Sequence, residues 1–437
     1  MKHKIHVIGA GLAGCEAAHQ IARRGIAVEL YEMKPERYTP AHRYPGFAEL
    51  VCSNSLRADR LENAVGLLKE EMRLLDSLIM EAADRTRVPA GGALAVDRTA
   101  FSDYITSKIK KNPRITLHEG EVASLEGLEG IIIVASGPLT SEALSQEIAD
   151  KIGGERLHFF DAAAPIVMGD SLDYEKVFAA SRYGKGTDDY LNCPMTKEEY
   201  QGFYQALISA ECAQLHGFEG QEVFEGCMPV EVMAKRGEQT LLFGPLKPVG
   251  LTAPDGTRPY AVVQLRKEDE AGRMYNLVGF QTHLKFGEQK RVFSMIPGLE
   301  QAEFARFGVM HQNTYLNSPK LLDAFYRLRA DENLFFAGQM TGVEGYVESA
   351  ASGLYAGLAA AFQAEGRQMP ALSGKTAMGA LARYISSSPS ADFQPMNITF
   401  GIIDPPEQRF RKKAEKNTYL SQRALEEVRG WAEGLAK

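Results

Sequence analysis

Residues 5–32, IHVIGAGLAGCEAAHQIARRGIAVELYE, decide the fold class of this chain. The run IHVI at 5–8 is short and mostly apolar, which is typical of a buried parallel strand. A glycine-rich turn follows, and the next residues predict a helix that ends at Gly25. The run AVELY at 27–31 predicts a second strand that leads into Glu32. This βαβ order predicts an α/β protein whose first domain is built on a parallel sheet.

The turn of this unit carries a dinucleotide-binding spacing. Gly9 permits the tight turn, Gly11 lets the backbone approach a pyrophosphate, and Gly14 lets the helix pack close to the strand. The start of the helix offers N–H donors to the phosphates. Glu32, eighteen residues after the last glycine, offers an acceptor to the ribose hydroxyls. Because the motif lies between a strand and a helix and is followed by an acid, it predicts a bound dinucleotide.

A second glycine-rich segment, late in the chain, indicates which dinucleotide binds. A predicted strand at 333–337 leads into Gly338, Gly342 and Gly345, and a small-residue helix follows at 348–363. Such a pair of segments is typical of a two-part FAD fold, in which the late segment closes over the ribityl chain and the flavin. We therefore predict FAD, with these glycines in close backbone approach; packing by small residues is the alternative. No second complete GxGxxG unit is visible, so NAD(P)H is expected to bind only transiently.

The character of the chain changes near residue 150 and changes back near residue 305. A length of 437 residues suits two to three domains. We predict a two-part, Rossmann-like FAD-binding domain from 1–150 and 305–437, with an inserted α/β domain at 151–304 that faces the substrate. Within the first part, residues 62–84 predict one long amphipathic packing helix.

The bulk composition excludes several classes of protein. The net charge of −7, from 49 basic and 56 acidic residues, does not steer the chain to nucleic acid, so an RNA partner needs a local basic patch. The five cysteines are widely spaced and form no CxxC or zinc-type cluster, which predicts reduced thiols, a cytoplasmic protein and no metal. No apolar run approaches the ~20 residues of a membrane helix, and the chain enters a strand without a signal peptide.

Two cysteines lie in unusual settings. Cys52 lies among small polar residues after a loop rich in Tyr, Pro and Arg, near the predicted flavin half of the site. Cys227 lies in the turn-like run FEGCMPVE, with acids and the pair Lys235 and Arg236 nearby. Cations lower the pKa of a thiol, so Cys227 is a candidate nucleophile. Taken singly, each is at least as well interpreted as a structural cysteine.

Long and specific blocks run through most of the sequence. They are VIGAGLAGCEAA at 7–18, LVCSNSLR at 50–57, VPAGGALAVDR at 88–98, FEGCMPVEVMA at 224–234, FGPLKPVGL at 243–251, RPYAVVQLRKE at 258–268, YNLVGFQTHLKFGEQKRVFSMIPGLE at 275–300, FAGQMTGVEGYVESAASG at 336–353 and MNITFGI at 396–402. In these blocks the chain resembles the TrmFO family, the folate- and FAD-dependent tRNA (uracil-5-)-methyltransferases. It departs from the family pattern at Gln312, where Arg is expected, and its C-terminal segment is the least similar part.

The resemblance implies a reaction and roles for both cysteines. It implies methylation of C5 of a tRNA uridine in the T-loop, with 5,10-methylenetetrahydrofolate as carbon donor, reduced FAD as reductant and NAD(P)H as the source of electrons. A thiolate that adds to C6 of uracil makes C5 nucleophilic. We assign this thiol to Cys227, and we assign Cys52 to the flavin side, in proton transfer or as a transient adduct site. The swapped assignment stays open.

A uracil in a folded tRNA loop must be everted, which requires a basic and aromatic rim. The candidate cations are Lys285, Lys290, Arg291, Arg409, Arg411, Lys412 and Lys413, for which a solvated charged face is the alternative. His283 and His311 are interpreted as structural histidines, with flavin or folate contact as the alternative. Three other functions stay open: the same chemistry on ribosomal RNA, an FAD oxidoreductase acting on a small molecule, and a flavin-bearing RNA-binding protein. We expect a monomer or weak dimer.

Overall fold

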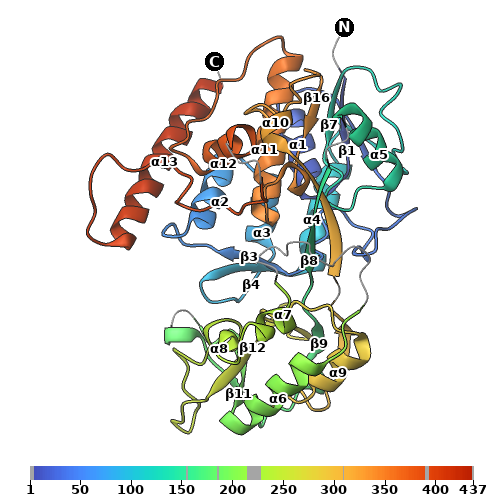
Figure 1. The fold of residues 1–437 in the computed structure, drawn as a ribbon. Helices are drawn as coiled ribbons and strands as arrows, with labels where there is room; N and C mark the ends of the chain where they lie inside the picture. Colours follow the sequence, from blue (N-terminus) through green and yellow to red (C-terminus); the bar gives the residue numbers. More distant parts are fainter. Residues whose placement is uncertain are drawn as a thin grey trace.

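The computed structural model describes residues 4–153, 156–184, 187–213, 228–308, 310–388 and 393–435, without the side chains of 156–162 and 310–314. Figure 1 shows two parts, one around a parallel sheet with helices on its faces and one around a separate antiparallel sheet. The predicted α/β class, with an FAD-type fold, is confirmed. Cys227 lies outside the described residues.

The parallel sheet begins with the predicted βαβ unit and ends with a strand from late in the chain. Its strand order is β16-β7-β1-β2-β6, and all neighbours are parallel. The unit and the sheet comprise β1 (Ile5–Ile8), α1 (Leu12–Arg23), β2 (Val28–Glu32), β6 (Ile115–Glu119), β7 (Ile131–Val134) and β16 (Leu334–Phe336). Since β16 pairs with β7, the first and last thirds of the chain share one sheet.

Small residues bring the late segment against the glycine-rich turn. Helix α11 (Tyr346–Ala364) packs on α1. A Cβ atom at Gly353 would lie 2.1 Å from the carbonyl oxygen of Ala13, and one at Gly357 would lie 2.8 Å from Cα of Ala17. The two helix backbones therefore approach too closely for any larger side chain. Because of this contact, the segment before α11, which contains Gly338, lies beside the start of α1.

The antiparallel sheet takes all its strands from residues 166–306 and has a hydrophobic core of its own. Its order is β10-β11-β12-β13-β9-β14. The strands and the helices beside them are β9 (Ile166–Met168), β10 (Phe178–Ala179), β11 (Tyr190–Met195), α6 (Lys197–Ser209), α7 (Val230–Lys235), α8 (Thr240–Phe243), β12 (Ala261–Lys267), β13 (Met274–Leu277), α9 (Phe286–Phe293) and β14 (Phe304–Arg306). An antiparallel ribbon of β8 (Arg156–Ala162) and β15 (Met310–Leu316) lies at the junction of the two parts.

The other elements complete the first part. They are β3 (Ser55–Ala58), α2 (Ala64–Leu74), α3 (Leu78–Arg85), β4 (Arg87–Val88), β5 (Ala93–Val96), α4 (Arg98–Lys110), α5 (Glu142–Lys151), α10 (Ser318–Leu321), α12 (Ala377–Ser387) and α13 (Lys413–Leu435), with a short 3₁₀ turn at Gln339–Thr341. Two further 3₁₀ turns, at Gly169–Ser171 and Arg182–Gly184, belong to the second part. Among the described helices, none is both long enough and apolar enough to span a bilayer.

The single helix predicted over 62–84 is wrong, because the structure breaks it into α2 and α3. Asp76 between them has a φ of 54°, and the Ser77 side chain accepts a hydrogen bond from the backbone of Met80 to cap α3. The buried carboxylate of Glu16 accepts the Ser77 hydroxyl at 2.6 Å and the Ile79 N–H at 3.0 Å. The apolar spacing continues across the break, so the sequence pattern does not reveal it.

Glu71 makes the stability of this part depend on pH. It is buried in α2 and accepts hydrogen bonds from the N–H groups of Ala377 and Met378 at the start of α12, at 2.6 and 2.9 Å. Desolvation raises the pKa of Glu71 from 4.5 to about 8, against the opposing effect of these two bonds. Between these values the folded protein keeps a proton that the unfolded chain has released. The free energy of unfolding therefore falls as pH rises, by up to about 1.4 kcal/mol per pH unit.

Glu71→Gln is expected to remove this contribution to the pH dependence, because an amide carries no titrating proton. Urea unfolding of both proteins at several values between pH 5 and 9 measures the difference. Glu70→Gln is the matched control, since Glu70 lies at the surface and pairs with Arg73 at 3.3 Å. Parallel curves for Glu71→Gln and the unmodified protein would show that Glu71 is already ionised when folded.

Candidate active site

The predicted dinucleotide turn is built around the carboxylate of Glu32. This side chain, at the end of β2, is largely buried and accepts the N–H of Ala10 at 2.8 Å and the N–H of Lys34 at 3.0 Å. A carboxylate has about four acceptor positions. Two therefore stay available for the hydroxyls of a ribose, in the role predicted for Glu32.

The three glycines of the turn differ in how much space a side chain would have. Gly9 has a φ of +99°, and a Cβ atom there would lie 2.6 Å from the carbonyl oxygen of Ala135. A Cβ at Gly14 would lie 1.7 Å from the carbonyl oxygen of Gly9. By contrast, a Cβ at Gly11 would meet nothing within 4 Å. Gly9 and Gly14 are thus required by the fold itself, whereas Gly11 opens onto free space beside the start of α1.

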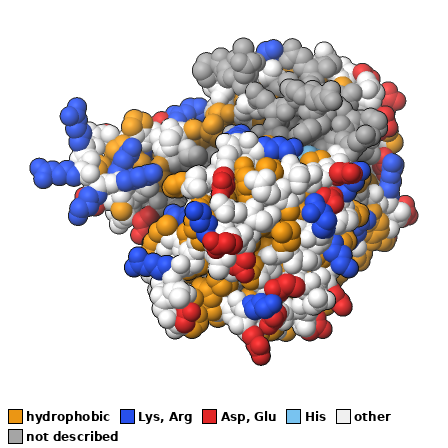
Figure 2. All heavy atoms as spheres, turned by 60° about the horizontal axis from the view of Figure 1, so that its bottom comes forward, with side chains coloured by type: hydrophobic (Ala, Val, Ile, Leu, Met, Phe, Trp, Pro, Cys, Tyr) orange, Lys and Arg blue, Asp and Glu red, His pale blue; other side chains and the backbone are white. Residues whose placement is uncertain are grey.

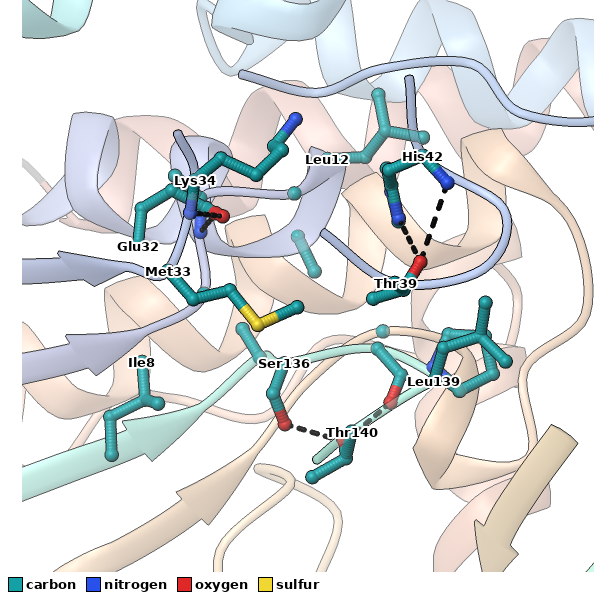
Figure 3. Close-up of a pocket in the computed structure, with 18 of the residues that line it drawn as sticks. Ile8, Leu12, Glu32, Met33, Lys34, Thr39, His42, Ser136, Leu139 and Thr140 are labelled. Atoms are coloured by element: carbon teal, nitrogen blue, oxygen red, sulfur yellow. Dashed lines mark hydrogen bonds between the residues drawn. The ribbon is translucent and has the colours of Figure 1, made fainter. Parts of the chain in front are cut away.

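That free space is an open cavity of about 1190 Å³, a volume that includes the solvent at its mouth. Figure 3 shows Glu32 and Lys34 on one wall, Thr39 and His42 on another, and Ser136 and Thr140 below them. Thr39 and His42 are joined by a 2.6 Å side-chain hydrogen bond, and Ser136 and Thr140 by one of 2.7 Å. The full lining is Ile8–Ala13, Tyr31–Lys34, Thr39, His42, Ala48, Glu49, Val51, Gly120–Val122, Ala135–Ser141, Leu144, Gly338, Gln339, Tyr346 and Ser349.

The late glycines divide into two groups. Gly338 lines the cavity, and a Cβ there would touch Cβ of Ala13 at 3.3 Å. A Cβ atom at Gly342 would lie 2.4 Å from the ring of Phe393. A Cβ atom at Gly345 would lie 2.4 Å from the carboxylate of Glu348. All three have positive φ. Only Gly338 is therefore placed at the cavity wall, while Gly342 and Gly345 shape the turn that leads into α11.

These features fit a dinucleotide such as FAD. The start of α1 has no side-chain cap, so its first N–H groups face the cavity with the positive end of the helix dipole. Gly11 leaves room for a pyrophosphate beside them, and Glu32 lies at the end of the adjacent strand for the ribose. The cavity extends from this turn to Gly338 and Tyr346, so it spans the early and the late segments as a long ligand requires.

The loop that carries Cys52 closes one side of this cavity. Tyr346, at the start of α11, accepts the N–H of Cys52 at 2.6 Å and the N–H of Ser53 at 3.2 Å with its hydroxyl oxygen. Arg98 donates to the carbonyl oxygens of Leu50 and Cys52 and forms a buried ion pair with Glu268. The Cys52 loop is therefore fixed by helices α4 and α11, and Cys52 itself is partly exposed.

The antiparallel sheet also forms hydrogen bonds to this loop. Arg266 on β12 donates to Asn54 at 2.9 Å and to Ser53 at 2.6 Å. Asn54 in turn donates to the carbonyl oxygen of Lys267 at 2.9 Å. The burial of Arg266 lowers its pKa, and nearby Glu268 opposes that shift. Cys52 thus lies where the two parts of the molecule meet.

A second cavity, of about 1430 Å³ with its open mouth included, also adjoins the Cys52 loop. Glu49 lines both cavities, Val51 lines the first and Leu50 lines the second. The rings of Phe286, Phe307 and Phe304 stack along the second cavity, with centroids 4.9 and 5.0 Å apart. Phe286 is 55% exposed, so the outer face of this stack is open. Arg43, Arg98 and Arg306 add positive charge to the walls.

Comparison with known proteins places the chain in a family. The family described as "Glucose inhibited division protein A" matches residues 4–368. Proteins named "Methylenetetrahydrofolate--tRNA-(uracil-5-)-methyltransferase TrmFO" are 59% identical in Listeria monocytogenes serotype 4b, over all of both chains, and 61% identical in Desulfitobacterium hafniense, over 99% of both. The relative of that name in Acetivibrio thermocellus is 60% identical over 96% of this chain and 97% of its own.

The chain belongs to the TrmFO family. The predicted resemblance is thereby confirmed. Among solved structures, two crystal forms of Aquifex aeolicus GidA match this TrmFO chain with TM-scores of 0.72 and 0.73. They are 16% identical, and the match covers 99–100% of this chain and 74–76% of theirs. At that identity the likeness shows a shared fold and no more.

The charged and histidine positions predicted for this TrmFO chain have mixed surroundings. Lys285 pairs with Glu211 at 2.6 Å and Arg291 with Glu288 at 2.6 Å, which offsets their charge. The exposed cations Arg409, Arg411, Lys412 and Lys413 precede or begin α13, where Figure 2 shows basic side chains on the projection at the left. The side chains of His311 and Gln312 lie outside the described residues.

His283 is held as a buried partner of Glu231, at 2.5 Å between Nδ1 and Oε1. Burial lowers its pKa, but hydrogen bonds to Cys212 and Glu231 prevail and raise the pKa of His283 to about 9. His283 lines neither of the two cavities beside the Cys52 loop. Its partners are therefore Glu231 and Cys212 in the second part of the molecule.

The sequence did not single out the residues that fix the Cys52 loop in this TrmFO chain. Arg98, Arg266 and Tyr346 lie within the blocks of family resemblance, at 88–98, 258–268 and 336–353. Arg266 also carried a local signal, because it interrupts an apolar strand with a charge. Glu268 lies in the same block as Arg266, whereas Phe304 and Phe307 lie outside the blocks.

Proposed function

We propose that this chain methylates C5 of a uridine in tRNA, with 5,10-methylenetetrahydrofolate as carbon donor and reduced FAD as reductant. The reaction is the one named for relatives that are 59–61% identical over essentially the whole chain. The structural observation that supports it here is the position of the Cys52 loop. Its residues Glu49 and Val51 line the dinucleotide cavity, and Glu49 and Leu50 line a cavity with stacked aromatic rings and arginines. Cys52 follows these residues directly in the sequence but is not itself a lining residue of either cavity, and we propose that its thiol acts at this boundary.

Bound FAD would supply the redox chemistry that turns a methylene into a methyl group. It would be held by the α1 turn at Gly11, by Glu32 and by Gly338. The phenylalanine stack and its arginines suit a planar, negatively charged or electron-rich ligand such as a folate or an everted base. Tyr346 and Arg98 tie the backbone of the Cys52 loop, and the thiol that this loop carries is proposed to take part in proton transfer.

The covalent step is proposed for Cys227. Its thiolate adds to C6 of uracil, which moves electron density onto C5, and C5 then bonds the methylene carbon as one C–N bond of the folate breaks and that nitrogen takes up a proton. The second C–N bond is exchanged for a C–H bond by the hydride that bound, reduced FAD would supply. The proton on C5 must leave before the sulfur is expelled from C6. Cys52 is the proposed partner for this transfer, with the swapped assignment of the two thiols as the alternative.

The finer features of this function are also proposals. The target is a T-loop uridine, NAD(P)H is the transient electron source, and the enzyme acts in the cytoplasm as a monomer or weak dimer. The region 151–304 is proposed to face the RNA and the folate. The exposed basic residues before α13 are proposed to contact the RNA backbone, because phosphate contacts supply most of the sequence-independent affinity.

The test is a single reaction series. The purified flavoprotein is incubated with unmodified tRNA, methylenetetrahydrofolate and NAD(P)H, and digested RNA is analysed for 5-methyluridine by mass spectrometry. We expect 5-methyluridine in tRNA only when the folate is present. Product in ribosomal RNA but not in tRNA would move the target to ribosomal RNA. Flavin reduction without product in either RNA would contradict the methyltransferase proposal.

Tyr346→Phe is expected to slow methylation more than it weakens FAD binding. The change removes the oxygen that accepts two N–H groups of the Cys52 loop, which costs about 1–3 kcal/mol of stability. A loop displaced by about 1 Å costs on the order of 10²-fold in rate. Initial rates of 5-methyluridine formation and the flavin content of the purified protein measure the two effects.

Tyr384→Phe serves as the control, because the Tyr384 hydroxyl donates to Gln394 at the surface, far along the chain from the loop. It is expected to retain the rate of the unmodified enzyme. Equal rates for Tyr346→Phe and Tyr384→Phe would show that the Tyr346 hydroxyl does not position Cys52.

A further inference from the structure

Three side chains from separate segments converge in the second part of the molecule. Cys212 follows α6, Glu231 lies on α7, and His283 follows β13. One ligand atom from each lies within 4.8 Å of the other two. The cluster lies outside both cavities beside the Cys52 loop, and the proposed reaction makes no use of it.

Backbone pairing holds two of these side chains in place. Cys212 forms an antiparallel bridge with Leu284. The N–H of Ala213 donates to the carbonyl oxygen of His283 at 2.8 Å, and the N–H of Lys285 donates to that of Glu211 at 3.0 Å. The segments on either side of Cys212 and His283 are thus locked together. Their thiol and imidazole are brought together before any ligand binds.

Glu231 is held on the same cluster by hydrogen bonds of its own. Its Oε2 accepts the Thr282 hydroxyl at 2.8 Å, and its Oε1 accepts the N–H of His283 at 2.9 Å. The N–H of Val230 donates to the carbonyl oxygen of Gln281 at 2.7 Å, which ties the start of α7 to the same loop. The Glu231 side chain is 1% exposed and that of His283 is 7% exposed. Carboxylates buried to this degree are paired or coordinate metal ions.

We propose that Cys212, Glu231 and His283 bind a divalent transition-metal ion of the Zn²⁺ type. A thiolate, an imidazole and a carboxylate form a borderline-soft donor set that favours such an ion over Mg²⁺ or Ca²⁺. Metal–ligand distances of about 2.0–2.3 Å place tetrahedral ligand atoms roughly 3.3–3.7 Å apart. The ligand atoms lie within 4.8 Å of one another, and to reach that geometry Nδ1 of His283 must lose its proton and move away from Oε1 of Glu231, which is 2.5 Å away. Three protein ligands leave a fourth position open.

A bound ion would join segments that are separated in the sequence, with water completing its fourth position. Cys212 precedes the segment 214–227 in the sequence, and Glu231 lies four residues after Cys227. An ion bound to Cys212 and Glu231 therefore closes a loop of chain that carries Cys227. Closing a long loop stabilises a fold through the entropy of its unfolded state.

The test uses the flavoprotein after treatment with a chelator, with Zn²⁺ as the probe. Isothermal titration measures affinity and stoichiometry, and X-ray absorption at the zinc edge identifies the ligand atoms. We expect one equivalent of Zn²⁺ with a sulfur ligand at about 2.3 Å. Cys212→Ser is expected to remove that sulfur and to weaken binding at least 100-fold. Cys52→Ser, at the cysteine proposed for the flavin side, is expected to leave the sulfur ligand and the Zn²⁺ affinity unchanged.

Two further variants make the assignment specific. His283→Gln and Glu231→Gln are each expected to weaken Zn²⁺ binding, and loss of nitrogen scattering is expected for His283→Gln alone. The proposal is overturned if the unmodified protein binds no Zn²⁺ in equimolar amount. It is also overturned if the sulfur ligand persists in Cys212→Ser and disappears in Cys227→Ser. Neither the Zn²⁺ affinity nor the identity of the ligand atoms depends on methylation. The outcome of this test is therefore independent of the proposed function.

Discussion

Alanine at Cys52 is expected to lower the rate of 5-methyluridine formation by about 10²- to 10⁴-fold, the range typical of a lost proton-transfer group. The protein is expected to fold and to bind FAD, because Tyr346 and Arg98 hold the loop through its backbone and not through the thiol. Cys227→Ala is expected to cost about 10⁴-fold or more, as the loss of a covalent nucleophile does. Mass spectrometry of digested tRNA measures both.

Cys193→Ala is the control for loss of a thiol. Cys193 is fully buried in the core of the antiparallel sheet, and desolvation raises its pKa far above the usual value, so it holds no thiolate. This variant is expected to keep its methylation rate. If Cys52→Ala is equally active, the thiol of Cys52 takes no part in the chemistry and the proposal for this residue fails.

Trapping distinguishes the two assignments of the thiols. In tRNA that contains 5-fluorouridine, C5 has no proton to lose, so the sulfur that adds to C6 stays attached. We expect a covalent RNA adduct with Cys52→Ala and none with Cys227→Ala. The reverse pattern would exchange the roles of the two cysteines and leave the reaction class unchanged.

Gly11→Ala is expected to leave the fold intact and to weaken FAD binding by roughly 10- to 100-fold. A Cβ at this position touches no protein atom, so it occupies only the space beside the start of α1. Forcing a methyl group into a packed contact costs about 1–3 kcal/mol, which here is lost from binding. Titration of FAD into flavin-depleted protein measures affinity, and chemical unfolding without FAD measures stability.

Gly14→Ala is the matched variant with the opposite expectation. Its Cβ would lie 1.7 Å from the carbonyl oxygen of Gly9, so the helix must move away from the strand. We expect the flavin-free protein to lose about 3 kcal/mol of stability or more. If Gly11→Ala binds FAD as tightly as the unmodified protein, the pyrophosphate does not lie at this turn.

The features that the sequence predicted are those with a short-range cause. The strand–turn–helix of residues 5–32 is determined by local apolar runs and glycines, and the structure has it within one residue at each strand. The break at Asp76 was missed because its cause, the carboxylate of Glu16, lies sixty residues earlier in the chain. Tertiary contacts of this kind override a continuous helical pattern.

The candidate site divides in the same way. Gly9, Gly11, Gly14 and Glu32 were predicted because their roles follow from backbone geometry near one turn. The positions of Gly342 and Gly345 were not, because both glycines face parts of the chain that a sequence does not bring together, such as Phe393. The cluster of Cys212, Glu231 and His283 is spread over 72 residues, from 212 to 283, so no metal-type spacing appears in the sequence.

The pairing of β16 with β7 has a consequence for synthesis on the ribosome. The parallel sheet is incomplete until residues 334–336 have been made, and α11 must follow before α1 can bury its small-residue face. At about 5–20 residues per second, the N-terminal βαβ unit waits roughly 15–70 s for these partners. The antiparallel sheet has all its strands by residue 306 and a core of its own. The middle of the polypeptide is therefore expected to become protease-resistant on stalled nascent chains before the beginning does.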